Sequence, residues 1–234
     1  MKRLAACLIP LTLLLALPAQ ANLTVHPMRA SVDGKRSTQM RIYSQSTQPQ
    51  YIQASLRRIV DPASDQEHEV EVEPGEAAIA ITPGKFALAG GGNRLIRLIP
   101  LQPVEAETAY RVYFEGVRGP EETSIEGGDG AQASIGVNLV WGALVNVLPA
   151  EGTVRPRVQG DVLYNDGTLR LGITSIADCE GSRCTAHDLS RSLYPGSSLA
   201  LPFTVTPGNT VQLRYRLTRD GYREHMQTIT PSEI

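Results

Sequence analysis

The stretch Ser134-Ile-Gly-Val-Asn-Leu-Val-Trp-Gly-Ala-Leu-Val-Asn-Val-Leu-Pro149 decides the fold class of this chain. All its odd positions before the proline are apolar: Ile135, Val137, Leu139, Trp141, Ala143, Val145 and Val147. A period of two over this length predicts a long β-strand with one apolar face. A Gly-rich acidic loop at residues 126–130 precedes it. Such a strand is either a core strand of a sandwich or a strand that is lent to another protein.

Short alternating segments with turn signals between them precede the long strand. They cover residues 23–32, 39–43, 51–60, 77–81, 94–101 and 110–118. Asp33-Gly34, Asp61-Pro62 and Gly119-Pro120 are typical of turns, and no segment shows a convincing helical period. About seven short strands of this kind predict an all-β chain that begins with an immunoglobulin-like antiparallel sandwich.

A second β domain is predicted after the long strand. Residues 149–156 resemble a linker, so we expect one domain over residues 22–152, which carries the long strand, and another over residues 153–234. Asp166-Gly167 and Asp220-Gly221 each lie between alternating segments and predict hairpins. Residues 199–205 are expected to form a further strand.

The N-terminus has the pattern of a secretory signal. Lys2 and Arg3 precede an apolar run, and Ala19-Gln20-Ala21 is a small-x-small cleavage site. Residues 1–21 are therefore predicted to be removed and the mature chain exported. A membrane anchor is disfavoured because the run is short and Pro10 interrupts it. A lipoprotein site at Cys7 is disfavoured because no apolar stretch precedes it.

The charge balance indicates which partners are unsuitable. The chain has 22 Lys and Arg against 24 Asp and Glu, and loss of Lys2 and Arg3 leaves 20 against 24, a formal charge of −4. A net acidic chain offers no overall basic field, which argues against a nucleic-acid partner.

Two cysteines remain after signal removal. Cys179 and Cys184 form an even pair in an exported chain, which favours a disulfide. The alternative is a metal site that includes His187, but no fourth ligand lies nearby in sequence. We therefore expect the disulfide, and neither a metal nor a cofactor.

Signals of catalysis are weak. The histidines lie far apart in the sequence, there is no Gly-x-Ser-x-Gly elbow, and Glu105 and Glu107 are expected to be solvated beside a loop. The sequence favours binding of another protein over enzymatic turnover of a small-molecule substrate.

The order of these features resembles the periplasmic pilus chaperones of the chaperone–usher pathway. Residues 23–34 resemble their opening strand, residues 110–118 their F strand, and the stretch that ends at Pro149 their G strand. Cys179 and Cys184, followed by residues 192–196, resemble the branch that serves common-pilus and other alternate-class fimbriae. The resemblance covers nearly the whole mature chain.

The resemblance implies two immunoglobulin-like sandwiches arranged as an L with a cleft between them. Such a chaperone acts in the periplasm, lends its G strand to pilin subunits and delivers them to an outer-membrane usher. By position relative to Pro149, the donor side chains are Ile135, Val137 and Leu139. Burying each is worth about 1.5–3 kcal/mol. The same strand also makes self-association possible.

The resemblance further implies a carboxylate anchor made of an Arg on the first strand and a Lys on the G strand. The Arg corresponds to Arg29, which the sequence alone would leave as a solvated charge. The Lys position corresponds to Leu144. The chain therefore uses Arg29 alone, recruits another cation such as Arg155 or Arg157, or grips the client terminus differently.

Two other functional classes remain open. The first is a secreted immunoglobulin-like structural pilus subunit or adhesin, although residues 22–27 leave little room for an N-terminal donor extension. The second, a secreted enzyme, is disfavoured by the weak catalytic signals.

Overall fold

The computed structural model describes residues 22–73, 75–119 and 139–232. Within these residues the chain is built of strands and connecting loops, and no helix is long and apolar enough to cross a membrane. The first domain contains β1 (Leu23–His26), β2 (Arg29–Val32), β3 (Thr38–Ser44), β4 (Gln50–Val60), β5 (His68–Glu71), β6 (Ile79–Thr82), β7 (Lys85–Leu88), β8 (Asn93–Pro100), β9 (Thr108–Val117) and β10 (Val140–Val147).

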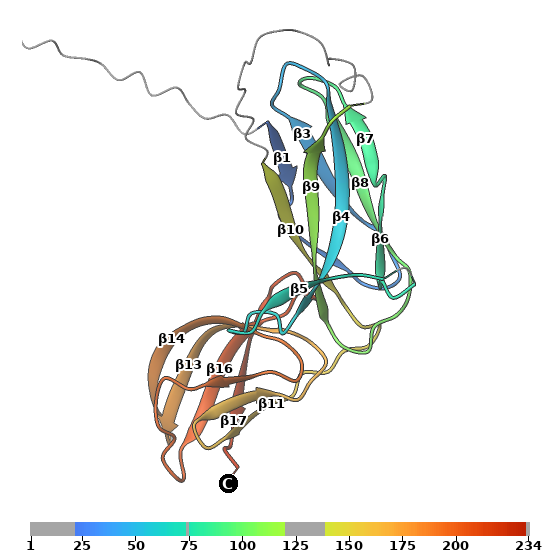
Figure 1. Ribbon diagram of the computed structural model, residues 1–234. Helices are drawn as coiled ribbons and strands as arrows, with labels where there is room; N and C mark the ends of the chain where they lie inside the picture. The colour runs from blue at the N-terminus through green and yellow to red at the C-terminus, as the bar shows by residue number, and fades with distance from the viewer. Residues whose placement is uncertain (1–21, 74, 120–138, 233–234) are drawn as a thin grey trace, which may run out of the picture.

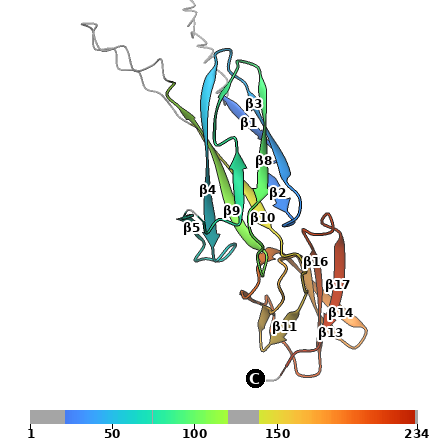
Figure 2. The ribbon, with the colours of Figure 1, turned by 90° about the vertical axis from the view of Figure 1, so that its right-hand side faces the viewer.

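The first domain is a sandwich of two sheets, seen edge-on in Figure 2. One sheet has the order β1-β3-β8-β6 and the other β2-β10-β9-β4-β5, with β7 also paired to β4. Met40, Ile42 and Ile96 from the first sheet and Val112 and Phe114 from the second are fully buried between them. This confirms the all-β, immunoglobulin-like prediction.

The opening segment is two strands rather than one. Leu23 and Val25 are buried in β1, whereas Ala30 and Val32 are buried in β2, so the buried parity changes across Pro27. A shift of one residue moves side chains to the opposite face of a strand. The chain crosses here from one sheet to the other, and β2 pairs with β10 in parallel, an exception to the antiparallel prediction.

The decisive stretch forms β10 in its second half. Ala143, Val145 and Val147 point into the core as the alternation predicts, and Trp141 packs against the same core. The alternate residues Leu144 and Asn146 lie on the other face of the sheet. The first half of the stretch, through Asn138, lies outside the described residues.

The second domain contains β11 (Pro156–Gln159), β12 (Val162–Asn165), β13 (Leu171–Glu180), β14 (Arg183–Leu193), β15 (Ser198–Ala200), β16 (Thr210–Arg216) and β17 (Glu224–Ile229). Its sheets have the orders β11-β12-β15 and β14-β13-β16-β17. The hairpin predicted at Asp220-Gly221 joins β16 to β17. The proposed boundary between residues 152 and 153 falls in the connection from β10 to β11 and stays a prediction.

The hairpin predicted at Asp166-Gly167 is wrong. β12 pairs with β11 and β15, whereas β13 belongs to the other sheet, so this segment crosses between sheets. The Asn165 side chain holds the crossing, because its Nδ2 donates to the carbonyls of Leu169 and Leu193 at 2.8 and 3.0 Å. The strand expected over residues 199–205 is also shorter, since β15 spans Ser198–Ala200 and Pro202 follows two residues later.

Cys179 and Cys184 form a disulfide across the end of the β13–β14 hairpin. This confirms the predicted pairing. It also removes both thiolates from the alternative metal site with His187, because a disulfide sulfur is not a thiolate ligand.

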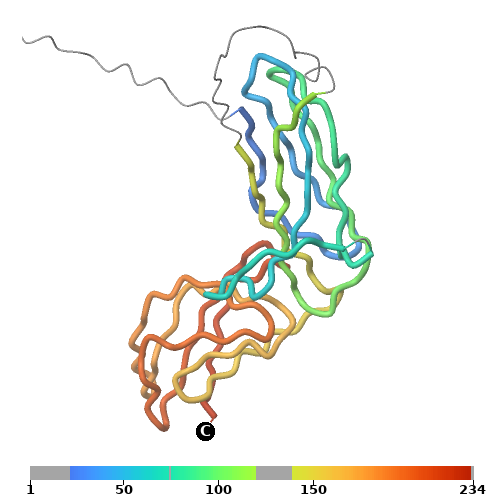
Figure 3. The backbone as a smooth tube through the Cα atoms, in the orientation of Figure 1, coloured from blue at the N-terminus to red at the C-terminus, as the bar shows by residue number. Residues whose placement is uncertain are grey.

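The two domains meet at a bend and together form an L (Figures 1 and 3). A small buried cluster of Ile59, Ala109 and Tyr194, with Leu144 packed against it, joins the first domain to the second. The outer face of β10 therefore takes part in the contact between domains.

Candidate functional site

One edge of β10 is paired along only part of its length. β10 pairs with β9 from Val140 to Val147, but on its other side it pairs with β2 only from Leu144 onward. Along 140–143 that side has no ladder partner among the described residues. An unpaired row of backbone N–H and C=O groups is a template for adding a strand from another chain.

Exposed apolar side chains mark the start of the same edge. Leu139 is 48% exposed and Val140 49% exposed. Of the predicted donor residues, Leu139 lies directly before β10, whereas Ile135 and Val137 lie outside the described residues. The assignment of all three as donor positions stays a prediction.

Arg29 and Leu144 lie side by side. They are register partners in the parallel pair of β2 and β10, and the Leu144 N–H donates to the Met28 carbonyl at 3.0 Å. Register partners project from the same face of a sheet. The first domain thus places an apolar side chain, not a second cation, next to Arg29.

Arg111 is the neighbour of Leu144 on the opposite side, on β9. Its Nε lies 2.6 Å from Glu69 Oε1, and its Nη2 lies 3.4 Å from Glu67 Oε1. The Tyr113 hydroxyl also donates to Glu69, at 2.7 Å from Oε2. Burial, followed by the hydrogen bond to Glu69, raises the pKa of Tyr113. Two carboxylates therefore balance the charge of Arg111.

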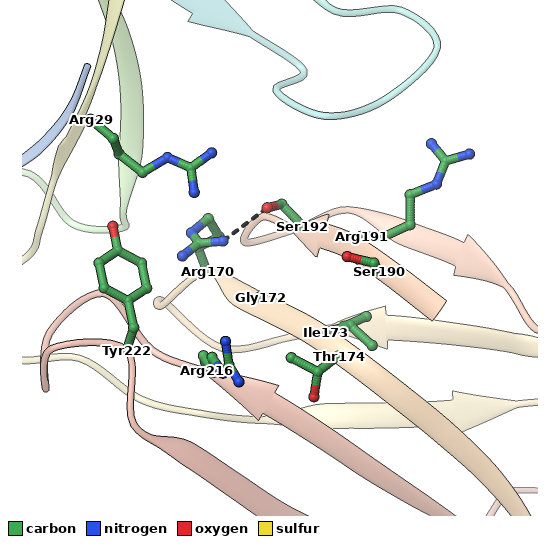
Figure 4. A pocket seen from close by; sticks show the side chains of 10 residues that line it. All are labelled: Arg29, Arg170, Gly172, Ile173, Thr174, Ser190, Arg191, Ser192, Arg216 and Tyr222. Atoms are coloured by element: carbon green, nitrogen blue, oxygen red, sulfur yellow. Dashed lines mark hydrogen bonds between the residues drawn. The ribbon is translucent and has the colours of Figure 1, made fainter. Parts of the chain in front are cut away.

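A basic cleft of about 320 Å³ separates Arg29 from the outer face of the second domain's β14-β13-β16-β17 sheet (Figure 4). Arg29, Arg170, Arg191 and Arg216 line it together with Gly172 and Tyr222, and no acidic residue belongs to its described lining. We call this cavity the basic cleft. Its charge suits an anionic group, for which a guanidinium is a bidentate partner.

The four arginines differ in how they are paired. Arg170 is buried and donates to Ser192 Oγ at 2.8 Å and to Thr218 Oγ1 at 3.0 Å. Arg216 has one distant ion pair, with Glu224 at 3.9 Å. The side chains of Arg29 and Arg191 have no hydrogen bond or ion pair with the residues that the structure describes.

A buried polar network lies behind the basic cleft. Glu107 is only 3% exposed, and its Oε1 accepts hydrogen bonds from Asn146 Nδ2 at 2.7 Å and Thr218 Oγ1 at 2.8 Å. Its Oε2 accepts from the Arg170 backbone N–H at 2.9 Å, and its Oε1 lies 3.6 Å from Arg170 Nε. Buried charges of this kind are normally paired.

The expectation that Glu107 is solvated is therefore wrong. Its partners Arg170 and Thr218 belong to the second domain, so no local pattern could identify them. Tyr194 joins the same network, with its hydroxyl 3.2 Å from Asn146 Nδ2. Burial raises the pKa of Tyr194.

The two cations that the sequence offered as substitutes for the lysine do not line the basic cleft. Arg157 on β11 is engaged elsewhere, with its Nε 2.6 Å from Asp166 and its guanidinium 4.4 Å over the Tyr164 ring. Arg155 precedes β11 and is likewise absent from the lining.

Known proteins resemble the chain over most of its length, although no family model matches it. A CS1 fimbrial protein of Escherichia coli, named as a fimbrial subunit, is 30% identical over 196 residues, which span 80% of this chain and 82% of that protein. A chain from the chaperone–tip adhesin complex of CFA/I fimbriae biogenesis is 26% identical, with a TM-score of 0.70, over 91% of this chain and all of the other.

The class 5 fimbriae chaperone CfaA shares the fold, with a TM-score of 0.73 at 24% identity, over 90% of this chain and all of that chain. The match includes both domains, because nearly the full length of each chain is covered. The chain belongs to the family of two-domain, immunoglobulin-like fimbrial chaperones of the chaperone–usher pathway.

Proposed function

We propose that this chain is a periplasmic chaperone that holds pilin subunits by donor-strand complementation and passes them to an outer-membrane usher. The observation that carries the proposal is the edge of β10 at residues 140–143, which has no described ladder partner and begins with two exposed apolar side chains. Its action is binding rather than catalysis.

The mechanism follows from the two edges of β10. β9 holds one edge, so the strand is presented in extended form. A pilin that lacks its last strand would pair its backbone with the other edge, and Ile135, Val137 and Leu139 would fill its groove. When no client is bound, a second copy of this chain could cover the same edge.

The alternative, a secreted structural pilus subunit or adhesin, has less support. The first domain contains its own β10, paired on both sides at Leu144 and beyond, so its sandwich supplies its own last strand. The related E. coli protein is named a fimbrial subunit, but the likeness extends through both domains to a chaperone.

Arg29 is proposed to bind the C-terminal carboxylate of the client. Its side chain is exposed, has no hydrogen-bond or ion-pair partner among the described residues, and lines the basic cleft. A carboxylate bound there would fix the end of the client chain, so that the client residues before it pair along the edge of β10.

Co-purification from the periplasm with the cognate pilin tests the proposal. Val137→Asp or Leu139→Asp should lose the pilin, because a charge enters an apolar groove. Met226→Asp is the matched control, since Met226 is 58% exposed on β17 in the other domain. Normal pilin recovery with both donor-strand variants would contradict the proposal.

A further inference from the structure

We infer that Arg216, on the second domain, supplies the second cation of the carboxylate site and so replaces the lysine absent from β10. The inference rests on the proposed function, because the ligand is the client's terminal carboxylate. The site would then close between the two domains, with Arg29 on one wall and Arg216 on the other (Figure 4).

The first domain offers no substitute next to Arg29. Leu144 occupies the position beside it, and Arg111, the next residue across the sheet, is held by Glu69 at 2.6 Å and Glu67 at 3.4 Å. Freeing Arg111 would leave two carboxylates close together without their cation. A client carboxylate would compete poorly with these two resident groups.

Arg170 is not available either, although it lines the basic cleft. Its guanidinium donates to Ser192 and Thr218 and is paired with the buried carboxylate of Glu107. A Cβ on Gly172 would lie 3.0 Å from Arg170 Nη1, so the guanidinium lies against the floor of the cleft. Arg170 therefore forms part of the floor of the cleft and is not free to bind the client carboxylate.

Arg216 stands beside that floor, because it is the register partner of Gly172 on β16. Its one described ion partner, Glu224, is 3.9 Å away. Glu224 also lies 3.7 Å from Arg214 and accepts a hydrogen bond from Thr174 at 3.1 Å. One carboxylate shared by two arginines leaves an excess of positive charge at this wall.

Arg191 is the remaining arginine and serves as a comparison. It lies on the edge strand β14 and also lines a separate groove with the loop that contains Asp61 and Asp65. In Figure 4 its guanidinium points away from Arg29 and Arg170. We therefore assign the carboxylate to Arg29 and Arg216 rather than to Arg191.

The test is co-purification of the full chain with its pilin from the periplasm. Arg216→Gln should reduce recovery at least about tenfold, because a charge-assisted hydrogen bond is lost. Arg216→Lys, which keeps the charge, should recover part of it. Arg191→Gln, whose guanidinium points away from Arg29, should lose less than Arg216→Gln. Arg183→Gln, which removes an exposed arginine of β14 outside the cleft lining, is the matched control and should behave like the wild type.

A second arm identifies the bound group. The pilin is extended at its C-terminus by Gly-Ser-Gly, which moves the α-carboxylate out of place. With this pilin, Arg216→Gln and Arg29→Gln should have no further effect. With the natural pilin, the double variant should lose less binding free energy than the sum of the two single losses, because both arginines bind one carboxylate.

Three results would overturn the inference: wild-type recovery with Arg216→Gln, an undiminished effect of that variant on the extended pilin, or an equal loss with Arg191→Gln. Urea unfolding checks that each variant folds. If Arg216→Gln does not fold, Arg216→Lys is used as the test variant. If Leu139→Asp and Val137→Asp leave recovery unchanged, the proposed function fails. If they abolish recovery while Arg216→Gln does not reduce it, only this inference fails.

Discussion

Leu144 of β10 lies directly beside Arg29 of β2 in the parallel pairing of the two strands. Leu144 also packs against the buried cluster of Ile59, Ala109 and Tyr194 that joins the domains. The position that the family resemblance assigns to a lysine is thus used for apolar packing between domains. A lysine at residue 144 would lose that packing, and with leucine there the second cation has to come from across the cleft.

Restoring the lysine tests this exchange of roles. Leu144→Lys should lower the free energy of unfolding by about 1–3 kcal/mol, because a partly buried apolar side chain is lost. In the Arg216→Gln background it should nevertheless restore pilin recovery, since the new cation lies beside Arg29. Urea unfolding and co-purification measure the two effects.

Leu144→Met is the matched control for that experiment. A volume-conserving apolar change should cost less than about 1.5 kcal/mol and should not rescue Arg216→Gln. Equal pilin recovery in Leu144→Lys/Arg216→Gln and Arg216→Gln alone would show that a cation at residue 144 does not reach the client carboxylate.

Glu107 should matter for stability far more than its neighbour Glu105. Glu107→Ala leaves the buried Arg170 without its carboxylate, and loss of one partner of a buried pair costs about 3–5 kcal/mol. Glu105→Ala removes an exposed carboxylate and should stay within about 0.5 kcal/mol of the wild type. Urea unfolding followed by circular dichroism compares them, and equal midpoints would rule out a stabilising role for the network.

Alkaline pH should weaken the contact between domains through Tyr194. Burial raises its pKa above the ordinary value of 10.0, so the folded state favours the neutral phenol. That contribution to stability is complete below about pH 10 and is lost as the pH rises through the folded-state pKa. Urea midpoints between about pH 8 and 11 measure the loss.

Tyr194→Phe isolates this contribution. The variant should start less stable, because Asn146 loses a hydrogen-bond partner, but its midpoint should fall less steeply at high pH. Tyr222→Phe, which alters an exposed tyrosine, is the control for the substitution itself. Parallel decline of the wild type and Tyr194→Phe would assign the alkaline loss to other groups, such as Tyr113 and Tyr215, whose pKa values are also raised.

Local alternation carried much of the fold prediction. The period of two in residues 141–147 predicts which β10 side chains enter the core, because a strand alternates its faces whatever its partners. The pairing of Cys179 with Cys184 was also predictable, since these are the two cysteines that remain once the predicted signal is set aside. The change of sheet at Pro27 and the crossing at residues 166–170 were not, because turn signals do not reveal which sheet the next strand joins.

By itself, the sequence determined that the chain is all-β, that its long strand has one apolar face, and that Leu144 stands where a lysine was expected. Only the tertiary structure decided that Glu107 is buried and that Arg29 shares a cavity with Arg216. The physical reason is distance along the chain. Alternation and turns depend on neighbouring residues, whereas the basic cleft exists only where a sheet of each domain faces the other across the bend.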